Sequence, residues 1–164
     1  MRKQPFILTC IIALLFLSCS KEDEKVDIHC ENLVNEPLPV GDPGMVFVAN
    51  AFTPNNDGMN DLFRPMAIQI NSISIKVFDK NSTLVFETNQ IGAGWTPGPI
   101  TANQTYYYRV EAVTVNNTKI GMCGELSALI CFPANVNKSN YKFEDQLTPL
   151  GFTGVTNENL ATCN

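Results

Sequence analysis

Residues Thr105 to Val115 read TYYYRVEAVTV, and this stretch decides the fold. It is dense in aromatic and β-branched side chains, which are typical of strands. Alternate residues fall into two sets, with Tyr106, Tyr108, Val110 and Ala112 on one face and Tyr107, Arg109 and Glu111 on the other. A period of two predicts a strand with one face buried in a core.

Short segments of the same character lie on both sides of this stretch. The candidate strands are 72–77, 84–86, 119–122 and 126–132. The first two are separated by the polar break Asp79 to Ser82 and are expected to pair as a hairpin, while Asn116 and Asn117 mark a turn. Short strands with turns about every ten residues predict an all-β chain, specifically a single-domain, antiparallel, immunoglobulin-like β-sandwich.

The first residues predict export. Arg2 and Lys3 precede an apolar run from Phe6 to Leu17, which is shorter than the roughly 20 residues that cross a bilayer and suits a signal peptide over residues 1–18. The triplet that ends in Cys19 resembles a lipobox, so Cys19 is expected to carry acyl chains. The alternative is an ordinary secretory signal with an unmodified cysteine.

The chain divides into four parts on this interpretation. Residues 1–18 are the signal peptide, 19–44 a lipidated cysteine and flexible tether, 45–131 the β domain and 132–164 a C-terminal extension. The tether begins with the charged run Ser20 to Lys25, which resembles the signal that places lipoproteins on the outer leaflet. We therefore expect a lipid-anchored, surface-exposed protein of the outer membrane.

Charge limits the range of partners. The formal net charge is −5 at pH 7, and no cluster of Lys and Arg side chains offsets it. Nucleic acid and other polyanions are therefore not expected as ligands. The expected partners are the membrane, through the lipid, and a surface protein or glycan.

The cysteines predict disulfides. Cys10 leaves with the signal peptide and Cys19 is assigned to lipid, so the remaining four are Cys30, Cys123, Cys131 and Cys163. An even number in an exported domain predicts two disulfides, and four cysteines can pair in three ways. Closure of a hairpin favours Cys123 with Cys131, which leaves Cys30 with Cys163, but the other pairings stay open.

A polar turn offers a candidate metal site. Asn55, Asp57, Asn60 and Asp61 surround Gly58 and supply oxygen ligands of the kind that calcium takes. The spacing does not match an EF-hand, because Thr53 and Arg64 fall where that loop needs acidic residues. The other interpretation is a turn in which Asn and Asp side chains accept hydrogen bonds from their own backbone, with Gly58 at positive φ.

Two aromatic residues are candidates for binding. Trp95 and the tyrosines at 106–108 have faces that suit a glycan or peptide platform. The alternative is that Trp95 fills the sandwich core together with Tyr106 and Tyr108, which leaves Tyr107 as the better candidate for an exposed contact.

Nothing in the sequence predicts catalysis. His29 is the sole histidine, and no nucleophile elbow, zinc motif or phosphate loop accompanies it. A pair of carboxylates distant in sequence would still suit a small surface hydrolase, so that alternative stays open. The expectation is a non-enzyme.

Several motifs together resemble one bacterial family. They are FVANAFTPNNDGMNDLF at Phe47–Phe63, the hairpin at 75–88, the pair Gly94-Trp95 and the aromatic strand from Thr105. In order and spacing they are similar to the gliding motility-associated C-terminal domain, also described as the type B sorting domain of type IX secretion. The resemblance implies an immunoglobulin-like fold at the cell surface.

The resemblance leaves the function open between three hypotheses. The first is a structural, adhesive or ligand-binding surface module, and the second is a calcium-dependent accessory or sorting-related component of secretion and gliding. The third is the small hydrolase. Family domains lie at the extreme C-terminus, whereas here a further segment follows residue 131, so the resemblance bears more directly on fold than on sorting.

Overall fold

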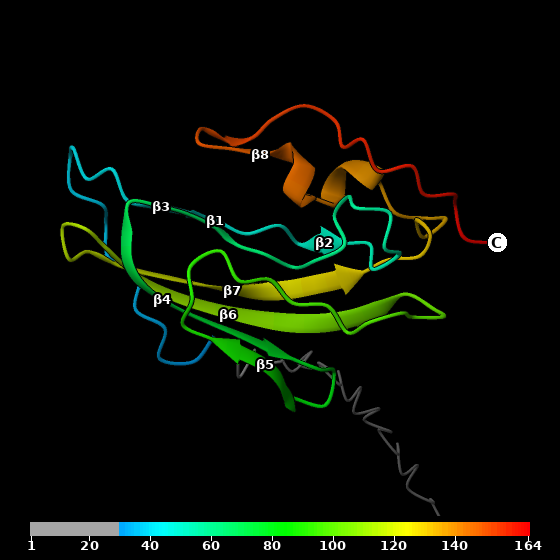
Figure 1. The fold of residues 1–164 in the computed structure, drawn as a ribbon, viewed down its shortest axis with the longest axis horizontal. Coiled ribbons are helices and arrows are strands. Elements are labelled where there is room, and N and C mark those ends of the chain that lie inside the picture. Colours follow the sequence, from blue (N-terminus) through cyan, green and yellow to red (C-terminus); the bar gives the residue numbers. More distant parts are fainter. Residues whose placement is uncertain (1–29) are drawn as a thin grey trace, which may run out of the picture.

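The computed structural model describes residues 30–164, which fold as a β-sandwich (Figure 1). The expected signal peptide, Cys19 and the tether as far as His29 lie outside the described residues. Apart from strands, the described part has two short 3-10 helices, η1 at Lys138–Asn140 and η2 at Glu144–Gln146. The all-β sandwich expected from the sequence is confirmed.

One layer of the sandwich is a five-stranded sheet. Its strand order is β2-β7-β6-β4-β5. The bounds of the strands are Ala51–Phe52 for β2, Ile70–Phe78 for β4, Leu84–Thr88 for β5, Gln104–Thr114 for β6 and Lys119–Ala128 for β7. All neighbours are antiparallel except β2, which runs parallel to β7 and makes the sheet mixed at that edge.

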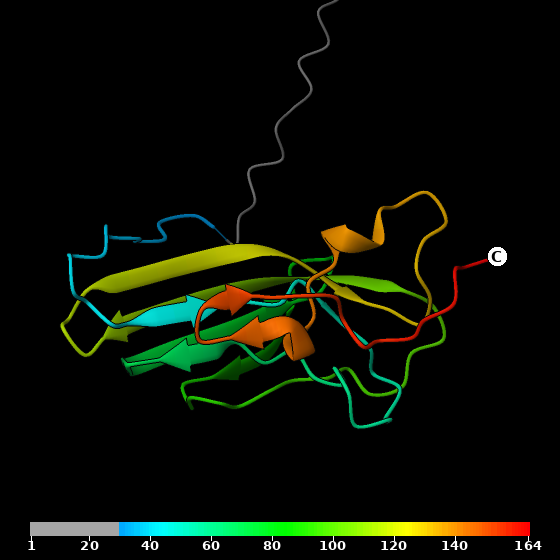
Figure 2. The same ribbon diagram turned by 90° about the horizontal axis from the view of Figure 1, so that it is seen from above.

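A second, smaller layer covers the inner face of this sheet. It consists of β1 at Met45–Phe47 and β3 at Met66–Ile68, which pair antiparallel, and an isolated bridge joins Phe63 to Trp95. Figure 2 shows β1 and β3 lying over the sheet. The side chains between the layers include Phe52, Phe63, Ile75, Val77, Val110 and Leu126, each exposed by 1% or less.

The predicted alternation of β6 is confirmed. Tyr106, Tyr108, Val110 and Ala112 are buried on the inner face. The hairpin of β4 and β5 forms around the predicted polar break, where the backbone N–H groups of Asn81 and Thr83 donate to Asp79 Oδ1 at 2.8 and 2.9 Å. Asn117 lies in the predicted turn between β6 and β7, at positive φ.

The two strands expected at 119–122 and 126–132 are instead one strand, β7, and residues 129–132 have left the sheet. Neither Gly121 inside the first expected segment nor Gly124 between the two interrupts the strand, because each fits a close contact. A Cβ on Gly124 would lie 3.1 Å from the Tyr108 hydroxyl, and one on Gly121 would lie 2.6 Å from Leu33 Cγ. Glycine here marks close approach rather than a break.

The described part of the expected tether, residues 30–44, is attached to the sheet. Cys30 is disulfide-bonded to Cys123 in β7, and the backbone N–H of Glu36 donates to Lys119 O at 2.9 Å. In return, Glu36 Oε2 accepts from the Lys119 backbone N–H at 2.8 Å. The segment from Cys30 to Glu36 is therefore packed against β7.

Asp42 holds this segment where it crosses to the second layer. Its Oδ2 accepts hydrogen bonds from the Thr114 and Thr118 hydroxyls at 2.8 and 2.7 Å, and its Oδ1 accepts from the Gly44 backbone N–H at 2.9 Å. These bonds, with that from Thr118 the strongest cause, lower the pKa of the Asp42 carboxyl, although burial opposes them. The loop at 37–43 is thereby fixed to the β6–β7 hairpin.

The extension packs against the other end of the sandwich. Ala51, Leu129, Phe132 and Phe143 form a second small core there. Residues 141–143 form no strand but bury Phe143 completely, and Gly151–Phe152 forms β9, which pairs with β8 at Leu147–Thr148.

The two expected disulfides are present, but the favoured pairing is wrong. The bonds join Cys30 to Cys123 and Cys131 to Cys163, with Cα separations of 5.5 and 5.1 Å. Because β7 runs on from Cys123 to Ala128, about 3.4 Å per residue places the end of the strand roughly 17 Å from Cys123 before the chain reaches Cys131. No hairpin brings those two cysteines together.

We expect Asp42→Asn to lower the melting temperature at pH 7 more than at low pH. A lowered pKa means that the folded state prefers the carboxylate, so this stabilisation is present at neutral pH and is lost as the pH falls through the lowered pKa. Thermal unfolding of both proteins at about pH 7 and pH 2.5 measures the effect. An equal difference at the two pH values contradicts it.

Candidate functional site: a groove on the outer sheet face

The outer face of the five-stranded sheet is polar and hollowed. Ser74 of β4 lies opposite Glu111 of β6, and Glu111 lies opposite Gly121 of β7. These positions alternate with the buried ones, so their side chains point away from the core. The absence of a side chain at Gly121 lets the N-terminal segment approach this face closely.

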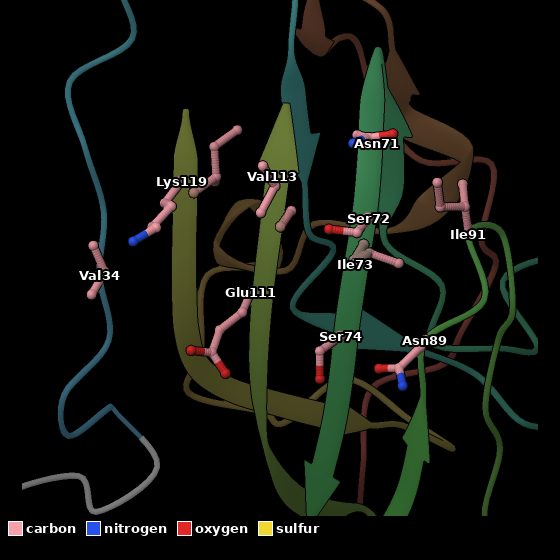
Figure 3. A pocket seen from close by; sticks show the side chains of 12 residues that line it. Val34, Asn71, Ser72, Ile73, Ser74, Asn89, Ile91, Glu111, Val113 and Lys119 are labelled. Carbon is pink, nitrogen blue, oxygen red and sulfur yellow. The ribbon is translucent and has the colours of Figure 1, made fainter. Parts of the chain in front are cut away.

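The hollow is a groove with a volume of about 710 Å³. Figure 3 shows Val34 of the N-terminal segment on one side, Ile91 of the loop after β5 on the other, and Ser72, Ser74 and Glu111 between them. Hydroxyl, amide, carboxylate and amine groups therefore line one surface. No aromatic residue is among the twelve that line it.

An ion pair fixes the floor of the groove. Arg109 Nε and Nη2 donate to the Glu111 carboxylate at 3.0 and 2.9 Å, and Arg109 Nη1 donates to the Glu31 carbonyl at 2.7 Å. The hydrogen bonds from Arg109, followed by the charges of Arg109 and Lys76, lower the pKa of Glu111. Glu111 is thus a preoriented acceptor rather than a proton donor at neutral pH.

The two aromatic candidates do not form one platform. Trp95 is half-buried on the inner side, where its ring meets Tyr106 edge-on with centroids 4.8 Å apart. Tyr107 lies on the outer face, between Phe78 and Glu125, beyond the groove. The core interpretation of Trp95 agrees with these contacts, and Tyr107 is half-buried.

The polar turn at 55–61 is held by its own side chains. The Asp61 carboxylate accepts from the backbone N–H groups of Asn56 and Gly58, the latter at 2.8 Å, and Asp57 Oδ1 accepts from the Met59 N–H at 2.9 Å. Gly58 adopts φ +91°, as expected for such a turn. These bonds match the Asx-turn interpretation.

The remaining candidate ligands of the turn are also engaged. Asn55 bonds to both the backbone and the carboxylate of Asp57, at 3.0 and 2.9 Å. Asn60 points to the extension, where its Nδ2 donates to Glu158 Oε2 at 3.1 Å and its Oδ1 accepts from the Asp145 N–H at 3.0 Å. The amide of Asn60 therefore serves a different contact from the carboxylates.

No metal-binding group of three or more His, Cys, Asp and Glu side chains occurs within residues 30–164. His29 lies outside the described residues. Glu158, which the sequence did not single out, joins the extension to the turn, because its Oε2 also accepts from the buried Thr53 hydroxyl at 2.8 Å.

The disulfide-bonded β-sandwich defines the class of this protein as a small exported β domain. Residues 46–123 match the model of the CHU_C type IX secretion signal domain, which is the family that the sequence motifs resemble. That domain implies a protein that is secreted or displayed at the cell surface. No curated protein and no solved structure matches the chain.

The match ends inside β7, so the second disulfide and the extension lie beyond it. Within residues 30–164, no helix has the length and apolar character needed to cross a bilayer.

Sequence reasoning did not find the groove. Its serines are ordinary polar positions of an alternating strand, and its walls come from segments near residues 34 and 91 that are far from them in the chain. The available signal was the run Asn71-Ser72 with Ser74, which places small polar side chains on the solvent side of a strand that continues with Lys76.

We expect Asp61→Ala to reduce the free energy of unfolding by about 1–2 kcal/mol, because two backbone N–H groups lose their acceptor. Urea unfolding of the variant beside the wild type measures the difference. Addition of calcium or of EDTA to the wild type is expected to leave its melting temperature unchanged. A rise with calcium that Asp61→Ala abolishes contradicts the Asx-turn interpretation.

Proposed function

We propose that this chain is a non-enzymatic, cell-surface lipoprotein whose β domain makes structural or adhesive contacts through the groove. The observation that carries the proposal is the polar groove on a rigid sheet face, with its acceptor already oriented by Arg109. A site that binds without catalysis needs shape and hydrogen-bonding groups but no reactive pair.

The lining of the groove favours a polypeptide as the ligand over a glycan. Ser72, Ser74 and Asn89 offer donors and acceptors, and Val34 with Ile91 offers apolar flanks. A sugar ring commonly stacks on an aromatic face, and the groove has none. An extended segment of a surface protein is the ligand that this chemistry suits best.

The anchor supports the same role. Acylation of Cys19 would hold the protein at the outer membrane, since each buried CH₂ of an acyl chain contributes about 0.8 kcal/mol. The anchored chain then meets the β domain at Cys30, which is bonded to Cys123 in β7, a strand that lines the groove. The negative formal charge again argues against nucleic acid as a partner.

Two alternatives make different demands. A calcium-dependent accessory of secretion and gliding requires cation binding at the turn, whose carboxylates already accept backbone N–H groups. A hydrolase requires a titrating carboxylate in a cleft, whereas the groove carboxylate Glu111 has a lowered pKa. Neither gains support from a specific contact.

Cys19→Ala is expected to release the protein from the membrane fraction, because no acyl chain can then be attached. Fractionation of cells that produce the variant, with mass spectrometry of the wild-type N-terminus, measures this. Ser18→Ala is the matched control and should stay with the membranes, since it keeps a small residue before the cysteine. Membrane retention of Cys19→Ala refutes the anchor.

Ser72→Trp is expected to reduce binding of the purified Cys19→Ala protein to intact cells about tenfold, because the indole fills the groove. Glu125→Trp, on the outer face of β7 but outside the groove, is the control. Flow cytometry with labelled protein provides the measurement. Equal binding by both variants places the contact elsewhere.

A further inference from the structure

Apolar side chains are exposed together at one end of the sandwich. Leu38 and Val40 lie in the loop at 37–43, and Val115 lies at the tip of the β6–β7 hairpin. Figures 1 and 2 both place this loop and this hairpin at the same end of the molecule. Val40 is 108% exposed, Val115 47% and Leu38 46%.

These loops are held in place rather than loose. The Asp42 carboxylate joins them by accepting from Thr114 and Thr118, and prolines at 37, 39 and 43 restrict the backbone. Ordering a loop on binding costs conformational entropy. Because these contacts already order the loop in the free protein, binding does not incur that cost. Solvent-exposed apolar groups on a prearranged tip are suited to insertion into an apolar phase.

The charge of the tip suits a membrane surface. Within residues 37–43 and 115–118, Asp42 is the only ionisable side chain, and its carboxylate is turned inward to two hydroxyls. The chain as a whole carries −5, so this end is short of the negative charge found elsewhere. Anionic headgroups would therefore repel this end less than the rest of the surface.

The anchor reaches far enough for this orientation. Cys19 and Cys30 are 11 residues apart, a span of at most about 40 Å. From Cys123, to which Cys30 is bonded, the start of β7 and the turn before it cover about 20 Å. The tip can therefore touch the bilayer that holds the acyl chains.

We propose that the tip formed by Leu38, Val40 and Val115 inserts into the outer leaflet of the membrane that carries the lipid anchor. The inference rests on the proposed acylation of Cys19, which supplies the high local concentration that a small apolar tip needs. Burial of three apolar side chains gives only a small gain in free energy, so this tip alone would bind weakly and reversibly. Its role is to fix the orientation of the sheet, and with it the groove, relative to the membrane.

The test places a fluorophore at the tip of the acylated protein. Val40→Trp and the control Val155→Trp, which replaces a residue 89% exposed on the extension, are reconstituted into phosphatidylethanolamine and phosphatidylglycerol vesicles. Some of the vesicles carry brominated acyl chains. The native Trp95 gives both variants the same background.

We expect at least a twofold stronger quenching for Val40→Trp than for Val155→Trp, with a blue-shifted emission. Adding Leu38→Asp and Val115→Asp to Val40→Trp should abolish the difference while the protein still floats with the vesicles. Equal quenching at both positions in vesicle-bound protein overturns the inference. Failure of either protein to float refutes the anchor instead.

Discussion

The described structure depends on the burial of one face of β6. This strand lies at the middle of the five-stranded sheet, and Val110 on its inner face is fully buried. Each neighbouring strand adds side chains to the same apolar layer, among them Val77 from β4 and Leu126 from β7. Because side chains alternate along a strand, burial of the inner set fixes the outer set at the same time. The polar groove is thus a consequence of the register that the core enforces.

Local pattern was enough to predict β4, β5 and β6, where period-two alternation and a polar hairpin turn agree. It failed at β7, because Gly124 resembles a break when its neighbour across the sheet, Tyr108, is unknown. The prediction of the disulfide pairing failed for the same reason, because the pairing depends on which strand lies beside which segment. The contacts at residues 30–36 likewise come from tertiary packing on β7 and leave no period in the sequence.

The candidate turn at 55–61 shows that the same side chains can either bind a cation or accept hydrogen bonds from the backbone. Oxygen atoms of Asp57 and Asp61 suit a cation or backbone N–H groups, and only their placement distinguishes these uses. The placement of Asn60 depends on Glu158, which lies far along the chain in a segment without pattern. A sequence can therefore indicate that a turn is polar without indicating what its polar atoms contact.

The bond between Cys30 and Cys123 has a mechanical consequence. Tension that arrives through the chain preceding Cys30 passes across the sulfur atoms directly into the middle of β7. The stretch between these cysteines, which are 93 positions apart in sequence, includes most of the core and lies off the path of the load. Hydrogen bonds such as that from Glu36 to Lys119 then carry no peeling force. Drag or shear on the domain is borne by covalent bonds as far as β7, whose first residues line the groove.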